Sequence, residues 1–461
     1  MYRTHHTASL QQKRIRKYVS NNDSYRFFNL LTCPDLLDKV ESLLPEHRER
    51  LFPPTETLSL FLAQAMSADS SCQNVVNDSA IKRLVGGLPS CSTHTGAYCR
   101  ARKRLPLEMV SAIARYSGQT LAEQTPKSWL WQGRPVRLVD GTTVTMPDTP
   151  ANQEVYPQPG SQKPGLGFPL CRLVGLICLS SGGLLNAAMA PHKGKGGDEQ
   201  ALLRSILDTL QTGDILLGDA YYATYFLLCS LLGEGIDAVF EQQGARRRCT
   251  DFRCGQRLGH RDHLVRLQKP KKKPEWMNQA DYDQAPDSIT ARELATGGKV
   301  LVTTLLCQKK TTKADLKALY RRRWNIELDL RNIKTTLGME VLSCKTPDMA
   351  LKEIWVYLLA YNLIRLLMVQ AALLGDLLPR QLSFKHTLQL CIAWRQFNHE
   401  DDDEKLGKLL ILIAHKQVGN RQGRIEPRAV KRRPKPYPLL TKTRKIAQEE
   451  IRKNGHAKKL K

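Results

Sequence analysis

The sequence predicts a multidomain α+β protein, and three observations lead to this prediction. The chain has 461 residues, enough for several hydrophobic cores, because single domains usually contain about 100–200 residues. Helical patterns fill residues 24–122, whereas strand and helix patterns alternate between 136 and 337. We therefore expect a helical domain at 1–125, a mixed α/β domain at 126–375, and a helical, basic region at 376–461.

The first domain is expected to contain helices only. Periodic apolar residues predict them at 27–44, 57–68, 79–85, 95–105 and 107–121. The segment Thr95–Arg104 carries four cations on barely two turns. It could be a helix that enters a DNA groove, or a basic helix that only faces solvent, and these residues alone support the two interpretations equally.

The second domain is expected to begin with three strands and to continue with alternating helices and strands. The strands lie at 136–140, 173–179, 184–190, 214–219 and 238–241, and helices at 198–210 and 225–232 separate the last three of them. Gly182-Gly183 forms the turn between the second and third strands. This succession is typical of a ribonuclease H-like mixed sheet.

A basic, irregular segment at 242–298 follows, and we interpret it as an insertion. After it, a strand at 300–305 leads into a long helix at 313–337. Thr312 and Asp315 have capping-box spacing at the start of this helix, and Gly338 is a suitable stop.

The 313–337 helix places four chemically active side chains on one face, next to an apolar stripe. At about 100° per residue these side chains fall within roughly 60° of one another; they are Tyr320, Arg323, Glu327 and Lys334. One carboxylate among cation and phenol donors suits phosphate chemistry. The alternative is a solvated helix in which Glu327 only pairs with Arg323 or Arg331.

Two expected strands end in acids, at Asp140 and Asp219, where ligands gather on open α/β sheets. With Glu327 they form a possible set of three carboxylates, which would repel one another unless divalent cations neutralised them. Hard oxygen ligands select Mg²⁺ or Mn²⁺, and two such ions can support phosphoryl transfer. Either Asp could instead be a structural strand-end residue. Possible substitutes are Asp148, Asp198 and Asp214.

The charge of the chain predicts a nucleic-acid partner. Lys and Arg exceed the acids by 70 to 44, which gives a formal charge of +26 and a field that attracts polyanions. Fifteen of these cations lie in 419–461, against three Glu. This segment is either a phosphate-binding tail or a solvated one, and such arms often become ordered only on binding.

The cysteines, the long apolar run and a glycine-rich segment show no sign of a further functional site. Scattered cysteines and the absence of a signal-like apolar start predict a reduced, cytoplasmic protein. The apolar run at 354–378 contains Asn362, Arg365 and Gln370, so we expect a buried helix and no membrane span. Cys249, Cys254, His260 and His263 match no common zinc spacing. Gly194-Lys195-Gly196-Gly197 is interpreted as a helix entry rather than a phosphate loop.

These motifs resemble those of a known family, the bacterial DDE transposases of the insertion-sequence four family. Its most specific motif is Tyr, two residues, Arg, three residues, Glu, six residues, Lys. That motif is matched without a gap by Tyr320, Arg323, Glu327 and Lys334. Asp140-Gly141-Thr142 resembles the family's first acid motif, and Asp219-Ala220-Tyr221 resembles the second.

The resemblance covers most of the chain. The 242–298 segment stands where the family has a β-rich insertion, and 424–433 resembles its basic C-terminal region. The resemblance implies that Asp140, Asp219 and Glu327 hold two Mg²⁺ or Mn²⁺ ions.

It further implies that Arg323 and Lys334 grip phosphates near the cleaved end, and that Tyr320 hydrogen-bonds to one. Relatives use aromatic residues near a flipped base. Trp324 and Trp276 are the candidates here, although core packing is the favoured explanation of both.

By the same resemblance, the protein is expected to carry out cut-and-paste transposition of an insertion sequence in the bacterial cytoplasm, at the nucleoid. The helical domain would bind terminal inverted repeats on double-stranded DNA, and the basic C-terminal region would contact DNA or a second protomer of a homodimer. Two alternatives remain at this point: a non-catalytic DNA-binding repressor derived from a transposase, and a ribonuclease H-like nuclease without strand transfer.

Overall fold

The computed structural model describes residues 52–67, 69–85, 87, 91–194, 196–394, 403–419 and 440–455. The first described helices are α4 (Pro54–Met66), α5 (Cys72–Val85), α6 (Gly96–Arg104) and α7 (Leu107–Glu123). They confirm four of the predicted helices, with α5 beginning seven residues earlier than the expected start at 79. The predicted 27–44 helix lies outside the described residues. A small core that includes Phe52, Val76 and Tyr98 joins α4, α5 and α6.

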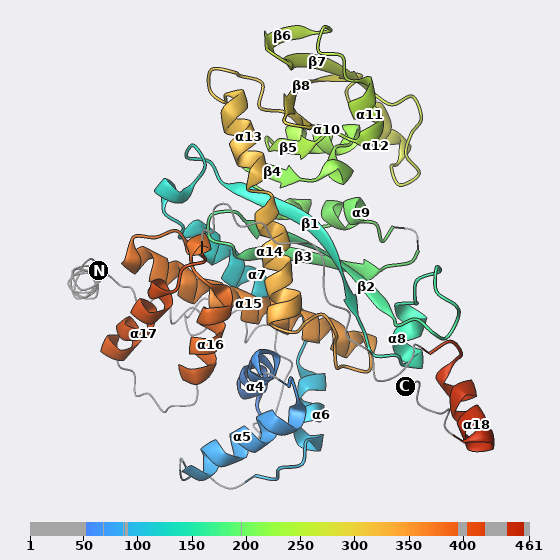
Figure 1. Ribbon diagram of the computed structural model, residues 1–461, viewed down its shortest axis with the longest axis vertical. Coiled ribbons are helices and arrows are strands. Elements are labelled where there is room, and N and C mark those ends of the chain that lie inside the picture. Colours follow the sequence, from blue (N-terminus) through green and yellow to red (C-terminus); the bar gives the residue numbers. More distant parts are fainter. Residues whose placement is uncertain are drawn as a thin grey trace.

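One mixed sheet of nine strands runs through the centre of the molecule (Figure 1). Its spatial order is β3-β2-β1-β4-β5-β9-β8-β7-β6. The core strands are β1 (Val136–Thr145), β2 (Leu170–Cys178), β3 (Leu184–Pro191), β4 (Ile215–Gly218) and β5 (Asp237–Glu241). β1, β2 and β3 form an antiparallel meander, and β4 and β5 run parallel to β1. The predicted meander and the later alternating units are therefore confirmed.

The insertion is more regular than predicted. It contains α11 (Gly244–Cys249), β6 (Gln256–Gly259), β7 (Asp262–Gln268), α12 (Gln279–Gln284) and β8 (Ser288–Thr296). The next strand, β9 (Lys299–Thr303), pairs with both β5 and β8, so the insertion extends the core sheet. Its strands escaped prediction because their buried positions include charged residues: Asp262, Arg292 and Glu293 lie inside, and Arg292 Nη2 pairs with Asp262 Oδ2 at 2.6 Å.

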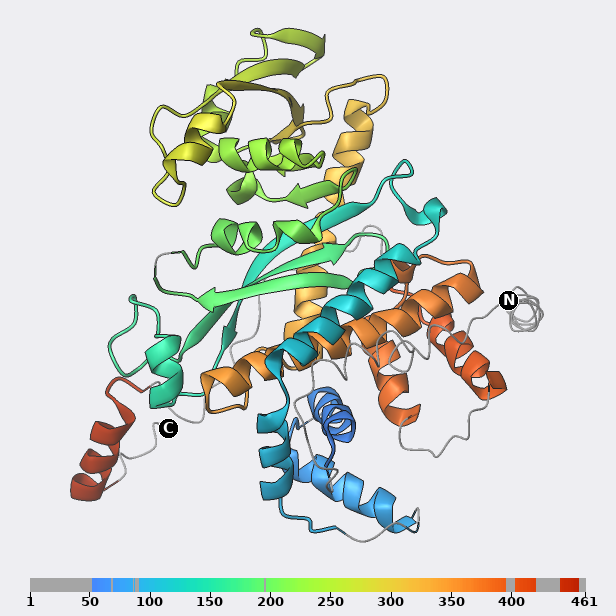
Figure 2. The same cartoon turned by 180° about the vertical axis from the view of Figure 1, so that it is seen from behind.

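Helices cover both faces of the sheet. Strand residues alternate between two cores, since Leu138 belongs to the larger one and Val139 to the smaller. The smaller core lies under α9 (Glu199–Arg204) and α10 (Tyr225–Gly233), with the short turns η3 (Leu207–Thr209) and η4 (Ala220–Tyr222). The larger core lies under α7, α14 (Trp324–Arg331) and α15 (Pro347–Gly375). In Figure 2, α7 and α15 run side by side across this face.

The expected continuous helix at 313–337 is wrong, because the segment is divided. It forms α13 (Lys313–Arg321), α14 and a π-helical turn, η5 (Asn332–Thr336). Around Arg322 the backbone bonds tighten to a three-residue spacing, and the Asn325 side chain donates to the Arg322 carbonyl at 2.7 Å. At the end, the Leu337 amide bonds five residues back. The capping box at Thr312 and the stop at Gly338, with φ of +92°, are confirmed.

The remaining helices lie mostly beyond the sheet. They are α8 (Pro150–Val155), α16 (Phe384–Trp394), α17 (Asp403–His415) and α18 (Arg444–Asn454), with short turns η2 (Lys127–Trp129) and η6 (Pro379–Gln381). Among the described helices, α15 alone has the length and composition to cross a membrane, and 72% of its most apolar window is buried inside the protein. The predicted burial of this helix is confirmed. Most of the predicted basic tail lies outside the described residues.

Candidate active site

Asp140 and Asp219 lie on neighbouring strands: Asp140 is in the middle of β1, which continues to Thr145 rather than ending at Asp140 as predicted, and Asp219 directly follows β4. β1 and β4 are parallel with Leu138 opposite Leu217, so both acids continue the row of side chains that faces α14. The Gly141 amide donates to Asp140 Oδ1 at 2.9 Å. The Tyr221 amide donates to Asp219 Oδ1 at 2.8 Å, which makes Asp219 the cap of η4.

Arg323 connects Asp140 to Glu327. Its Nη1 lies 3.6 Å from Asp140 Oδ2, and its Nη2 donates to Glu327 Oε1 at 2.6 Å. The 3₁₀-like turn before α14 gives Arg323 this position at the start of the helix. The ion pair between Glu327 and Arg323, which the solvated-helix alternative predicts, is therefore present. It is part of a partly buried cluster that also contains Asp140.

Burial has the largest effect on the pKa values of Asp140 and Glu199, and the charges of neighbouring carboxylates act in the same direction. Burial raises the pKa of Asp140 to about 6, against the opposing effects of the Gly141 amide and Arg323, and the charges of Asp219 and Glu199 raise it further. Burial and the charge of Asp219 also raise the pKa of Glu199. Sequence reasoning missed Glu199. The signal that could have indicated it is the acidic pair at the start of the helix between the third and fourth strands.

The other residues of the four-residue motif take different positions. Tyr320 is buried, and its hydroxyl donates to Glu241 Oε2 on β5 at 3.3 Å; burial raises its pKa. Lys334 lies in the π-helical turn and is half-buried. The single cleft-facing row predicted for a straight helix is therefore wrong, because the tight turn and the π turn change the helical phase. The structure joins Arg323 and Glu327 to Asp140, and it joins Tyr320 to Glu241.

Trp324 is exposed, with 59% of its surface accessible, so the favoured explanation of core packing is wrong for this residue. The substitute acids have structural partners. Asp198 caps α9 through the amides of Gln200 and Ala201, buried Asp214 pairs with Arg137, and Asp148 accepts from Gln153.

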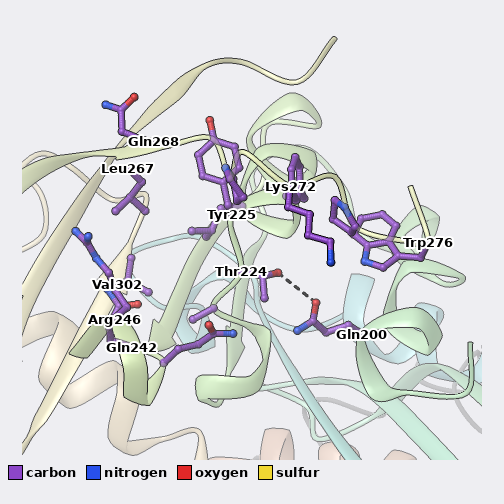
Figure 3. A pocket seen from close by; sticks show the side chains of 16 residues that line it. Gln200, Thr224, Tyr225, Gln242, Arg246, Leu267, Gln268, Lys272, Trp276 and Val302 are labelled. Carbon is purple, nitrogen blue, oxygen red and sulfur yellow. Dashed lines mark hydrogen bonds between the residues drawn. The ribbon is translucent and has the colours of Figure 1, made fainter. Parts of the chain in front are cut away.

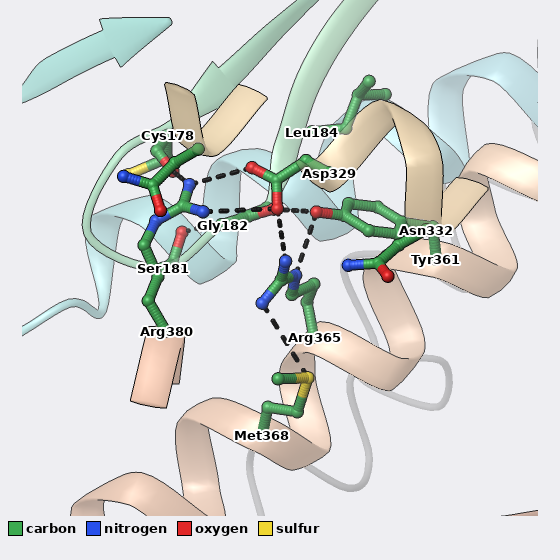
Figure 4. Close-up of polar contacts among 12 residues, drawn as sticks. Cys178, Ser181, Gly182, Leu184, Asp329, Asn332, Tyr361, Arg365, Met368 and Arg380 are labelled. Atoms are coloured by element: carbon green, nitrogen blue, oxygen red, sulfur yellow. Dashed lines mark hydrogen bonds and ion pairs between the residues drawn. The ribbon is translucent and has the colours of Figure 1, made fainter. Parts of the chain in front are cut away.

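A buried ion-pair cluster fixes α14 (Figure 4). Asp329, fully buried two residues after Glu327, accepts from Arg365 of α15 and, at 2.9 Å, from Arg380 Nη2 of η6. Arg380 also donates to the carbonyls of Cys178 and Leu179, where β2 ends. The helix that carries Glu327 is thereby tied to both α15 and the sheet.

A cavity of about 420 Å³ lies between the insertion and the core (Figure 3). Lys272 and half-exposed Trp276 come from the insertion, and Gln200 and Thr224 come from the core, where Thr224 Oγ1 donates to Gln200 Oε1 at 3.2 Å. The Trp276 ring stacks on the Arg204 guanidinium at 3.8 Å, so Trp276 is not a core residue.

The basic helix α6 exposes fewer cations than its sequence suggested. Arg102 is buried, stacks on Phe61 and Tyr98, and donates to Gln64 Oε1 at 3.2 Å. Arg100, Lys103 and Arg104 remain exposed.

The carboxylate oxygens of the cluster are the hard donors that Mg²⁺ or Mn²⁺ prefers. Burial, and to a smaller extent the charges of Asp219 and Glu199, raise the pKa of Asp140. A bound divalent cation would offset both effects, so the donor set fits such an ion. Among the described residues, no three His, Cys, Asp or Glu side chains are already gathered for coordination. At present one guanidinium, that of Arg323, bridges Asp140 and Glu327.

Comparison with known proteins gives consistent matches. The sequence profile described as "Transposase DDE domain" matches residues 131–363. The transposase InsG for insertion sequence element IS4 of Escherichia coli (strain K12) is 29% identical over 449 residues, 92% of this chain and 97% of that protein. The transposase for insertion sequence element IS421 of Escherichia coli is 34% identical over 76 residues, 16% of this chain and 20% of that protein. The cryo-EM structure of a piggyBac transposase synaptic complex with hairpin DNA covers 84% of each chain at 9% identity, with a TM-score of 0.41.

Proposed function

The chain belongs to the family of transposase DDE domains, whose profile matches half of its length, and we propose that it moves an insertion sequence by a cut-and-paste reaction at terminal inverted repeats. It is a DDE transposase, an enzyme that cleaves DNA and transfers the cut strands. The observation that supports the proposed site is the cluster in which Arg323 bridges Asp140 and Glu327, with Asp219 on the neighbouring strand.

In this proposal Asp140, Asp219 and Glu327 hold two Mg²⁺ or Mn²⁺ ions. When bound, such ions would supply Lewis-acid stabilisation of the charge that develops on the oxygens of a phosphoryl transfer. The protein positions the acids from three places: β1, the junction of β4 and η4, and α14. The clamp around Asp329 holds α14 against the sheet, so the carboxylates keep their mutual placement during the reaction.

The DNA-binding residues proposed near this site are Arg323, Lys334, Tyr320 and Trp324. Arg323 is within reach of both catalytic acids and offers a forked donor for a phosphate. The exposed ring of Trp324 is free of the core and suits stacking on a base, as does Trp276 beside its cavity. Tyr320 would have to exchange Glu241 for a phosphate oxygen.

The strand order β3-β2-β1-β4-β5 supports a ribonuclease H-like catalytic domain at 126–375. The division into a DNA-binding domain at 1–125 and a basic contact region at 376–461 stays a prediction. We place the enzyme on double-stranded DNA as a homodimer, in the bacterial cytoplasm at the nucleoid. The charge of +26 favours such a polyanionic partner.

The test of this function is end cleavage and joining. Purified protein, Mg²⁺ and a DNA fragment that carries both ends of the element are incubated, and wild type is compared with Asp219→Asn. Wild type is expected to cut at the element boundary and to join the ends to target DNA, whereas the variant should bind without cutting. Cleavage without joining would favour the nuclease alternative, and binding without cleavage by wild type would favour the repressor.

Arg323→Ala is expected to weaken both end binding and catalysis. Loss of one phosphate contact should also reduce the slope of log K against log salt by about one. Filter binding between 50 and 300 mM salt measures this slope, with the exposed Arg331 changed to Ala as the matched control. An unchanged slope would remove Arg323 from the phosphate contacts.

A further inference from the structure

The carboxyl group of Glu199 lies directly against Gly141, the residue that follows Asp140. A Cβ built on Gly141 would stand 2.3 Å from the Glu199 carboxyl carbon and 2.5 Å from its Oε1. No side chain can occupy that space without displacing Glu199. The missing side chain at position 141 therefore opens a passage from the α9 face of the sheet towards the edge where Asp140 lies.

Two contacts hold Glu199 at this edge. The Tyr222 hydroxyl, in the turn after Asp219, donates to Glu199 Oε2 at 3.4 Å. The neighbouring Gln200 side chain donates to the Tyr221 carbonyl at 2.5 Å. The start of α9 is thus attached to η4, the turn that Asp219 caps. These contacts place Glu199 near β1 and the end of β4.

Glu199 has no cation at ion-pair distance among the described residues. The charge of Arg172 lowers the pKa of Glu199, but the Arg172 side chain donates to the Gly197 carbonyl at 2.6 Å and contacts His192 Nδ1 at 3.0 Å. A half-buried carboxylate that feels the charge of Asp219 and has no cation at ion-pair distance among the described residues is stabilised by positive charge from elsewhere.

We propose that Glu199 is a fourth carboxylate of the metal site formed by Asp140 and Asp219, approaching it through the space that Gly141 leaves open. The proposal rests on the metal-dependent function argued above. It assigns Glu199 to direct or water-mediated contact with a divalent ion, on the side of the site opposite to Glu327.

Metal binding by the full chain, without DNA, tests this assignment. Mn²⁺ is titrated into the protein, and free Mn²⁺ is followed by electron paramagnetic resonance. Glu199→Gln keeps the size of the side chain and should raise the Kd for Mn²⁺ about tenfold or more. The matched control is Glu234→Gln, on the exposed end of α10, which should leave the Kd unchanged.

A second variant separates ligation from charge alone. Glu199→Asp keeps the negative charge but withdraws the carboxyl by one methylene, so a ligand should lose affinity with this change, whereas a distant charge should not. Far-UV circular dichroism checks that each variant is folded.

Asp140→Asn, measured in parallel, distinguishes this inference from the site itself. Loss of Mn²⁺ affinity in Asp140→Asn with wild-type affinity in both Glu199 variants would overturn the role of Glu199 alone. Wild-type affinity in all of these variants would overturn the metal site. Weakened binding in Glu199→Gln but not in Glu199→Asp would reduce Glu199 to an electrostatic contributor and would also refute ligation.

Discussion

Glu327→Gln is expected to reduce DNA cleavage by about a thousandfold or more, while the affinity for the element's ends stays nearly unchanged. The amide has the shape of the carboxylate and can still accept from Arg323 Nη2, which now bonds to Glu327 Oε1. It lacks the negative charge with which a carboxylate binds a divalent cation more strongly than an amide does. The loss should therefore fall on the chemical step. Single-turnover cleavage and filter binding, on the same labelled end fragment, measure the two effects separately.

Glu340→Gln is the control for this change, since Glu340 is an exposed residue just after the π-helical turn. It should cut and bind as wild type does. A Glu327→Gln protein that still cuts at the wild-type rate would remove Glu327 from the site. One that loses binding and cleavage in equal proportion would assign it to DNA contact or to folding instead.

Asp329→Asn is expected to destabilise the protein by about 3–5 kcal/mol, because it leaves two buried guanidinium groups without their counter-ion. Asp329 is fully buried, and the Arg365 side chain is only 4% exposed. Among the described residues, the Arg365 side chain would keep its contacts with the Tyr361 hydroxyl and Met368 Sδ, and neither of these groups carries a negative charge. Urea unfolding followed by far-UV circular dichroism, with the midpoint and slope compared to wild type, measures the change.

The matched control is Asp78→Asn, which breaks the ion pair with Lys82 on α5, where both side chains are about half exposed. Its effect should be below about 1 kcal/mol. If Asp329→Asn lowered the free energy of unfolding no more than Asp78→Asn does, the ion pairs around Asp329 would not be what holds α14 against the sheet. Residual cleavage by a folded Asp329→Asn protein would further show how far catalysis depends on that anchorage.

The sequence predicts most of the sheet but not the details of the long helical segment. The strands before the insertion alternate apolar and polar residues or are short apolar runs, so their positions follow from local patterns. Asp219 directly follows β4 as predicted, whereas the prediction that the first strand ends at Asp140 is wrong, because β1 continues to Thr145. The tight turn at Arg322 depends on a bond from the Asn325 side chain, and the π turn has no signal in hydrophobic spacing. The positions of Tyr320 and Lys334 were therefore not predictable from a uniform helical period.

Contacts between distant segments account for the other differences. Glu199 can lie against the strand that carries Asp140 because Gly141, 58 positions earlier, has no side chain, and no local sequence pattern indicates this contact. Trp324 was expected in the core because tryptophan usually is, yet the first turn of α14 directs it outward. In the insertion, buried ion pairs such as Arg292–Asp262 replaced the apolar residues that would have indicated strands.

The position of β9 has a mechanical consequence. Because β9 bonds to β5 on one side and to β8 on the other, the insertion cannot swing about a hinge without tearing the backbone ladder of the central sheet. The cavity beside Trp276 and the carboxylate at Asp219 are therefore expected to stay at a fixed distance from each other. A DNA end that contacted both places would therefore meet them at a spacing set by the backbone of the sheet.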